Sequence, residues 1–241
     1  MSGGKRVAIV QSCYIPWKGY FDLINLVDEF ILYDDRQYTR RDWRNRNRIK
    51  TAQGTQWLTI PVEVKGRYDQ RIDETLVSEP RWAARHWKTL HHSYASASRF
   101  DDYAGLVEGL YADATSPVLS KINRHFLDAL CEVLGIETKL SWSTDYDAQG
   151  DKTERLVSLC LAAGAAVYYS GPRAREYMNE ALFAEAGIVL EYMDYSDYPE
   201  YPQPHPPFEH NVTILDLLLS TGSDAPRYLK STLKPELARG R

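Results

Sequence analysis

The feature that most constrains this chain is a helix pattern enclosed by two short strand patterns near the N-terminus. Residues 6–11 (RVAIVQ) and residues 29–33 (EFILY) are short and apolar, which is typical of buried strands. Between them, Pro16 suits the first turn of a helix that runs to about Val27. Because two strands joined by a helix normally lie parallel in one sheet, this unit predicts an α/β fold.

The same alternation of strand and helix returns along the rest of the chain. Further strands are predicted at residues 57–64, 136–142, 165–170 and 188–193, with an edge or a bulge at Pro61. Helices are predicted at residues 80–98, 101–111, 117–134 and 173–186, from Asp151 to Gly164, and from Asn211 to Gly222. We therefore expect a single α/β domain over residues 1–241, with a mainly parallel, Rossmann-like sheet and a helical insertion at about 79–135.

Length and cysteine content narrow the class of protein. With 241 residues, 44% of them hydrophobic, the chain suits one large globular domain. The three cysteines are widely spaced and form no CxxC pair, which excludes a disulfide framework and is typical of a reducing compartment. The apolar run Val7–Val10 is too short for a signal-peptide core, and no stretch approaches the length of a membrane span. We therefore expect a cytoplasmic protein, as a monomer or an oligomer.

The charge is uneven along the sequence. The chain carries a net charge of −4, yet residues 36–50 contain seven Lys or Arg and one Asp. An acidic chain with one basic segment is atypical of sequence-independent DNA binding, which favours a basic domain. The segment suits a compact anion such as a phosphate, because guanidinium groups match phosphate oxygens. The alternative is a solvated face whose cations pair with Asp34, Asp35 and Asp42.

Three polar or aromatic segments follow predicted strands, where ligands bind in open parallel sheets. They contain most of our candidate residues. The catalytic candidates are Gln11, Asp34, Asp35 and, from the helical insertion, His86. The substrate-binding candidates are Tyr14, Trp17, Tyr20, Gln37, Tyr38, Arg46, Asn47, Arg48, Lys50, Ser170, Gly171 and Tyr177.

Several common catalytic motifs are missing from the sequence. It contains no HExxH, GxxxxGK[ST], GxGxxG or GxSxG pattern, so no metal site is predicted and no particular cofactor is indicated. Cys13 lies before a predicted helix, where a thiolate would be stabilised, but no base is apparent beside it. A small buried thiol is the simpler interpretation of that residue.

A group of motifs spread over nearly the whole chain resembles the WbqC-like protein family. They are Gln11-x-x-Tyr14-x-Pro16-Trp17-x-Gly19-Tyr20-Phe21, Asp34-Asp35-x-Gln37-Tyr38, Trp43-x-Asn45-Arg46-Asn47-x-Ile49, residues 57–62 (WLTIPV), residues 164–172 (GAAVYYSGP) with Tyr177, residues 201–203 (YPQ) and the segment Asn211 to Leu218. The chain departs from the family at Ser12-Cys13, where Pro followed by a small residue is more usual.

The resemblance implies an enzyme that modifies a sugar or a similar metabolite, for example by acylating an amino group. Members occur among bacterial genes for surface polysaccharides and other tailored small molecules. On this reading the ligand is a phosphate-bearing small molecule or a nucleotide-linked amino sugar, held by Arg46, Arg48 and Lys50. An aspartate or His86 would take the amine proton, and Ser170 with the Gly171 N–H would stabilise an oxyanion.

Two other functions remain open from the residues. The basic segment would equally suit a non-catalytic scaffold protein that docks a pathway enzyme or an anionic carrier. RNA binding through Arg44 to Lys50 is the third reading, and it predicts an affinity that falls steeply with salt.

Overall fold

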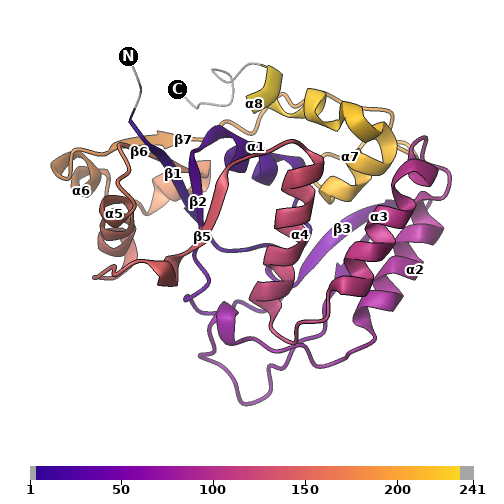
Figure 1. Ribbon diagram of the computed structural model, residues 1–241, viewed down its shortest axis with the longest axis horizontal. Coiled ribbons are helices and arrows are strands. Elements are labelled where there is room, and N and C mark those ends of the chain that lie inside the picture. Colours follow the sequence, from indigo (N-terminus) through magenta and orange to yellow (C-terminus); the bar gives the residue numbers. More distant parts are fainter. Residues whose placement is uncertain (1–3, 234–241) are drawn as a thin grey trace.

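A five-stranded, all-parallel sheet forms the centre of the computed structural model, which describes residues 4–233 (Figure 1). Its strands are β1 (Arg6–Val10), β2 (Glu29–Leu32), β5 (Lys139–Trp142), β6 (Val167–Ser170) and β7 (Val189–Tyr192). The spatial order is β5-β2-β1-β6-β7. The predicted α/β class with a parallel, Rossmann-like sheet is therefore confirmed.

The first strand lies at the centre of the sheet. Val7 pairs with Glu29 of β2 on one side and with Tyr168 of β6 on the other. The chain builds the sheet outward from β1 through β2 to β5, and then crosses to β6 and β7. The point between β1 and β6 is thus the place where the direction of construction reverses. Open α/β sheets bind ligands at such a switch point.

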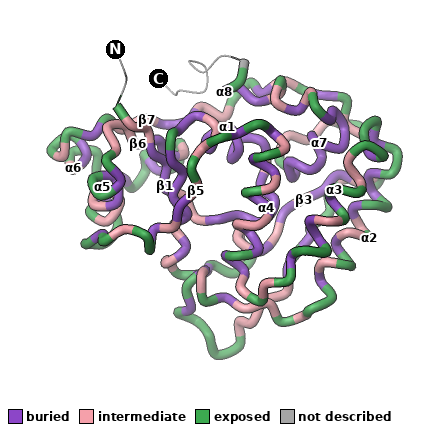
Figure 2. The backbone as a smooth tube through the Cα atoms, viewed as in Figure 1, coloured by how far each residue is buried: buried purple, intermediate pink, exposed green. Residues whose placement is uncertain are grey.

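Helices cover both faces of the sheet. They are α1 (Lys18–Leu26), α2 (Trp82–Tyr94), α3 (Phe100–Asp113), α4 (Leu119–Val133), α5 (Lys152–Ala162), α6 (Glu180–Glu185), α7 (Ile214–Thr221) and α8 (Lys230–Leu233). Alternate strand residues separate two cores. Ala8 and Phe30 pack with α1, α4 and α7, whereas Val7 and Ile31 pack with α5 and α6. Buried residues are concentrated in the central strands, α1 and α7 (Figure 2).

A separate antiparallel hairpin, β3 (Arg46–Thr51) with β4 (Gly54–Thr59), was not predicted. We expected one strand over residues 57–64 and none within the basic segment. The strand instead starts at Gly54 and ends at Thr59, just before Pro61, which has no N–H for a strand ladder. The basic segment therefore contains a strand in which half-exposed and buried residues alternate from Arg46 to Ile49, and Lys50 is buried as well.

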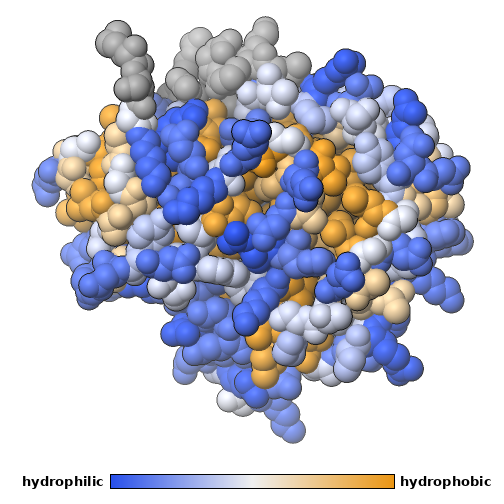
Figure 3. Space-filling view, in the orientation of Figure 1, coloured by the Kyte–Doolittle hydropathy of each residue, from blue (hydrophilic) through white to orange (hydrophobic). Residues whose placement is uncertain are grey.

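Most of the other differences between the predicted and the observed elements lie at the ends of helices. The helix predicted over 173–186 is divided into a 3-10 segment, Pro172–Glu176, and α6. The break lies before α6, where the Asn179 N–H donates to Thr153 Oγ1 at 3.3 Å. The last long helix begins after Thr213 rather than at Asn211, because the Thr213 hydroxyl accepts from Leu215 N–H. Within residues 4–233 no helix is long and apolar enough to cross a membrane, and hydrophilic side chains are spread over the face seen in Figure 3.

Candidate functional site

A cavity of about 1180 Å³ lies beyond the carboxyl ends of β1, β2 and β6, at the predicted edge of the sheet. Aromatic side chains form much of its wall: Trp17, Tyr20, Tyr33, Trp43, Tyr168, Tyr177 and Tyr195. Large, mostly apolar cavities with a few polar groups are the usual sites for small-molecule ligands. Its position at the switch point of the sheet supports the same interpretation.

The cavity lining is cationic. Arg36, Arg44, Lys152 and Arg173 contribute to it, and none of the described lining residues is an Asp or a Glu. Arg36 pairs with Asp35 at 2.9 Å, outside the lining. Lys152 and Arg173 form no ion pair among residues 4–233, so their charge is available to a ligand. Such a wall favours an anion over a cation.

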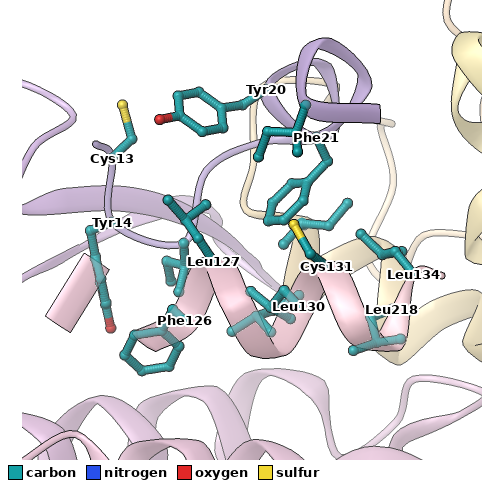
Figure 4. Packing of buried hydrophobic residues seen from close by; sticks show 14 of the residues in the cluster. Cys13, Tyr14, Tyr20, Phe21, Phe126, Leu127, Leu130, Cys131, Leu134 and Leu218 are labelled. Atoms are coloured by element: carbon teal, nitrogen blue, oxygen red, sulfur yellow. The ribbon is translucent and has the colours of Figure 1, made fainter. Parts of the chain in front are cut away.

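A hydrogen-bonded loop carries Gln11 and Cys13 to the cavity. Arg44 Nη1 donates to the Gln11 carbonyl oxygen at 2.8 Å and lies 3.3 Å from Cys13 Sγ. The Tyr20 hydroxyl donates to the same carbonyl at 3.1 Å. In Figure 4, Cys13 and the Tyr20 hydroxyl lie on one side of this loop. The Gln11 side-chain amide has no protein partner in the described chain, and it is therefore available to a ligand.

Cys13 is the buried thiol that the sequence suggested, but it also borders the cavity. Burial raises the pKa of its thiol to about 11, and the nearby Arg44 only partly opposes this shift. At neutral pH the side chain is thus a thiol rather than a thiolate, which is the reactive form.

Asp34 lies behind the cavity rather than in its wall. Its Oδ1 accepts the Ser12 N–H at 2.8 Å, and its Oδ2 accepts the Ser120 hydroxyl. Burial raises the pKa of Asp34, although these hydrogen bonds oppose the shift. The carboxyl group therefore fixes the loop at Ser12 and does not reach a ligand in the cavity.

Asp35 points in another direction and is also occupied by the protein. Burial disfavours its charged form, but hydrogen bonds from Arg36 and Ser143 lower its pKa overall. Arg155 Nη2 adds an ion pair at 2.7 Å. Because β2 ends at Leu32, the strand geometry does not itself force Asp34 and Asp35 to opposite faces. Their carboxylates nevertheless bind different groups of the protein and form no shared site.

Tyr14 and His86 form a buried pair, and neither residue belongs to the cavity lining. The Tyr14 hydroxyl contacts His86 Nδ1 at 2.9 Å and the Tyr111 hydroxyl at 2.6 Å. His86 Nε2 lies 3.1 Å from the Thr59 carbonyl oxygen, to which it can only donate. Burial lowers the pKa of His86 to about 4, so the ring is neutral at pH 7. Figure 4 shows Tyr14 extending beside Phe126, away from Tyr20.

The predicted phosphate ligands Arg46, Arg48 and Lys50 lie on β3 and do not line the cavity. Lys50 is buried and donates to the Pro207 carbonyl oxygen. Asn47, from the same strand, does reach the cavity. Its Nδ2 donates to the carbonyl oxygens of Tyr14 and Ile15 at 3.1 and 2.9 Å.

The structure therefore brings together about half of the predicted binding residues. Eight of the sixteen candidates line the cavity: Gln11, Trp17, Tyr20, Gln37, Asn47, Ser170, Gly171 and Tyr177. Eight do not: Tyr14, Asp34, Asp35, Tyr38, Arg46, Arg48, Lys50 and His86. The cationic lining residues were missed, although Arg36 and Arg44 belong to the basic segment and Arg173 directly follows Ser170-Gly171-Pro172.

No metal centre is evident in the described part of the chain. Among residues 4–233, no three His, Cys, Asp or Glu side chains are grouped so that they could hold a metal ion.

Comparison with known proteins gives a family but no solved relative. The model of the WbqC-like protein family matches residues 11–228. A Mycobacterium tuberculosis (strain ATCC 25618 / H37Rv) protein named "Uncharacterized protein Rv1507c" is 52% identical over 226 residues, which cover 94% of this chain and 98% of the relative. No solved structure matches. With the family model matching most of its length, this chain belongs to the WbqC-like protein family.

Proposed function

We propose that the chain is a small-molecule tailoring enzyme that binds a phosphate-bearing metabolite in the cavity. The observation that carries this proposal is the lining itself, with four cationic side chains and no carboxylate. A nucleotide-linked amino sugar is the candidate ligand, and transfer of an acyl or aminoacyl group to its amine is the candidate reaction. The chain belongs to the WbqC-like family, and the resemblance to that family is what suggested this class of substrate.

The lining residues suit distinct parts of such a ligand. Lys152 and Arg173 are without ion-pair partners in the described chain, and they are the groups that we assign to the phosphate. The free amide of Gln11 can both donate to and accept from sugar hydroxyl groups. Trp17 and Tyr177 offer aromatic faces against which a sugar ring can pack.

The proposed transfer requires a carbonyl site and a path for one proton. The amine would attack the acyl carbonyl, with the Ser170 hydroxyl and the Gly171 N–H, at the end of β6, facing the developing oxyanion. A C–N bond forms and the bond to the donor oxygen or sulfur breaks. We assign the amine proton to the departing oxygen or sulfur, because Asp34, Asp35 and His86 lie outside the lining.

Binding of glucosamine 1-phosphate tests the proposal with a probe that carries both an amine and a phosphate. The double variant Lys152→Ala/Arg173→Ala should weaken its binding at least about tenfold, the loss expected for one charge-assisted contact. Isothermal titration calorimetry provides the measurement. A matched control, Arg99→Ala/Arg227→Ala, removes two exposed arginines of the region around α3 and α7 and should leave the affinity unchanged. Equal binding by wild type and the cavity variant would contradict the proposal.

A non-catalytic binding protein is the second candidate, and one observation favours it. None of the described lining residues is an Asp, Glu or His, so the cavity contains no side chain that normally accepts a proton at neutral pH. In that case ligands should bind but remain unchanged. Mass spectrometry of mixtures with acyl and aminoacyl donors separates this function from a transferase.

A further inference from the structure

The outer face of the β3–β4 hairpin presents an unusual combination of side chains. The buried residues Asn47, Ile49 and Leu58 lie on the inner face of the hairpin. Arg48 lies directly opposite Trp57, and Arg46 is two residues away on the same face. With Trp43, which precedes β3, they form a surface that we call the arginine–tryptophan platform: Trp43, Arg46, Arg48 and Trp57.

The platform is preorganised by ring and cation contacts. The Trp43 and Trp57 rings are 5.2 Å apart between centroids and inclined at 46°. The Arg46 guanidinium lies 4.1 Å from the Trp57 centroid, and that of Arg48 lies 5.8 Å from it. Even so, 39% of Trp43 and 41% of Trp57 remain exposed. Two large rings are therefore held in place without being covered.

The positive charge of the platform is not neutralised locally. Arg46 and Arg48 take part in no ion pair among residues 4–233. The nearby carboxylate of Asp42 lies 3.6 Å from Arg44 Nε instead. By contrast, the exposed Arg71 pairs with the carboxylates of Asp73 and Glu74. Exposed rings beside unpaired guanidinium groups are a combination that nucleic-acid and nucleotide sites use.

The platform adjoins the cavity. Trp43 belongs to both, and its neighbour Arg44 and the β3 residue Asn47 also line the cavity. A ligand whose reacting end lies in the cavity would therefore place its other end against the two indole rings.

We infer that the arginine–tryptophan platform binds a nucleobase together with its phosphate, so that the cavity ligand is nucleotide-linked. This inference rests on the proposed function, since it assigns the distal part of the same ligand. A base can stack on the Trp43 and Trp57 rings, and the guanidinium groups of Arg46 and Arg48 match phosphate oxygens. A sugar phosphate without a base would not use the indoles. The same chemistry is offered by a soluble nucleotide and by the end of an RNA strand.

Calorimetry with AMP, CMP, GMP and UMP, each compared with ribose 5-phosphate, isolates the contribution of the base. We expect wild type to bind at least one nucleotide more tightly than ribose 5-phosphate. Trp57→Ala should weaken binding of that nucleotide about fivefold to 160-fold, which is the range of base–aromatic stacking, and leave binding of ribose 5-phosphate unchanged. Trp57→Phe keeps an aromatic face and should retain most of the affinity.

The phosphate part of the inference is tested by Arg46→Ala/Arg48→Ala, with Arg99→Ala/Arg227→Ala as the charge-matched control. Only the platform variant should weaken nucleotide binding. A five-residue single-stranded RNA identifies the source of the base. Much tighter binding than the monophosphate, with a steep loss as salt rises, indicates an RNA end, whereas equal binding indicates a soluble nucleotide.

Two results would overturn the inference. One is that neither the nucleotides nor the RNA bind more tightly than ribose 5-phosphate. The other is that Trp57→Ala binds them as wild type does. Glucosamine 1-phosphate, which carries no base, should bind Trp57→Ala normally and Lys152→Ala/Arg173→Ala poorly. If glucosamine 1-phosphate bound Lys152→Ala/Arg173→Ala as tightly as wild type, only the proposed phosphate site in the cavity would be contradicted. The two proposals can therefore fail separately.

Discussion

Replacing Asp34 by alanine should destabilise the protein strongly, although Asp34 touches no part of the cavity. The carboxylate accepts hydrogen bonds from Ser12 N–H and the Ser120 hydroxyl, and all three residues are buried. Removal leaves two buried donors without this acceptor, at about 1–3 kcal/mol each. The expected loss in the free energy of unfolding is therefore about 2–6 kcal/mol, against a typical total of about 5–15 kcal/mol.

Asp34→Asn separates this structural role from a role in proton transfer. The amide keeps one acceptor oxygen and nearly the same shape, and it removes a charge that burial disfavours. We expect it to lose only about 1–2 kcal/mol, because one of the two hydrogen bonds can persist. Urea unfolding followed by circular dichroism gives both values, and ligand binding is then compared at urea concentrations where each variant is folded.

Two results would refute this reasoning. The first is a free energy of unfolding for Asp34→Ala within about 0.5 kcal/mol of wild type, the size of an ordinary surface substitution. Alternatively, Asp34→Asn could fold and bind ligand like wild type and yet lose all turnover. The second result would restore Asp34 as the proton acceptor that the sequence suggested.

Three further predictions concern buried titratable groups, each followed as the difference in urea unfolding between wild type and one variant across pH. Burial works against the Glu29 carboxylate, but Lys5 and other partners lower its pKa to about 2. Wild type should therefore lose about 3 kcal/mol relative to Glu29→Gln between about pH 4.5 and pH 2, and a flat difference would exclude the role. Burial lowers the pKa of His86 to about 4, so wild type should weaken relative to His86→Gln as pH falls from about 6.5 to 4, whereas ligand affinity at neutral pH stays equal. Burial lowers the pKa of Lys18 to about 8, so wild type should gain about 1–2 kcal/mol over Lys18→Met between about pH 8 and 9.5; no gain would mean that the ammonium is not desolvated.

The sheet was predictable because its strands are buried on both faces. β1 and β2 read as nearly continuous apolar runs, and the helix between them implies parallel pairing. The strand β3 was not predicted because Ile49 is its only apolar side chain. Its inward positions include Asn47, which is buried through hydrogen bonds to the backbone rather than through apolar contact. A search for hydrophobic alternation cannot recognise such a strand.

The position of the site was predictable from the topology of the sheet, but the side chains that line the cavity were not. Parallel strands end at one edge of a sheet, so the segments after β1, β2 and β6 had to meet there. Which side chains enter the cavity depends on local backbone direction. Ile15 has a φ of 37°, rare for a β-branched residue, and this turn separates the directions of Tyr14 and Trp17. The residue types around Ile15 do not predict that backbone conformation.

The central place of β1 has a consequence for how the protein is made. Glu29, the β2 partner of Val7, is translated soon after synthesis begins. Tyr168, its β6 partner, is translated about 140 residues later. At about 5–20 residues per second, one edge of β1 waits roughly 7–28 s on the ribosome for its partner. Tyr195 and Asn211, which complete the cavity wall, emerge later still. A metabolite that fits the cavity can therefore rescue only nearly finished chains, and premature termination anywhere before β6 leaves the oldest strand of the molecule unpaired and open to aggregation.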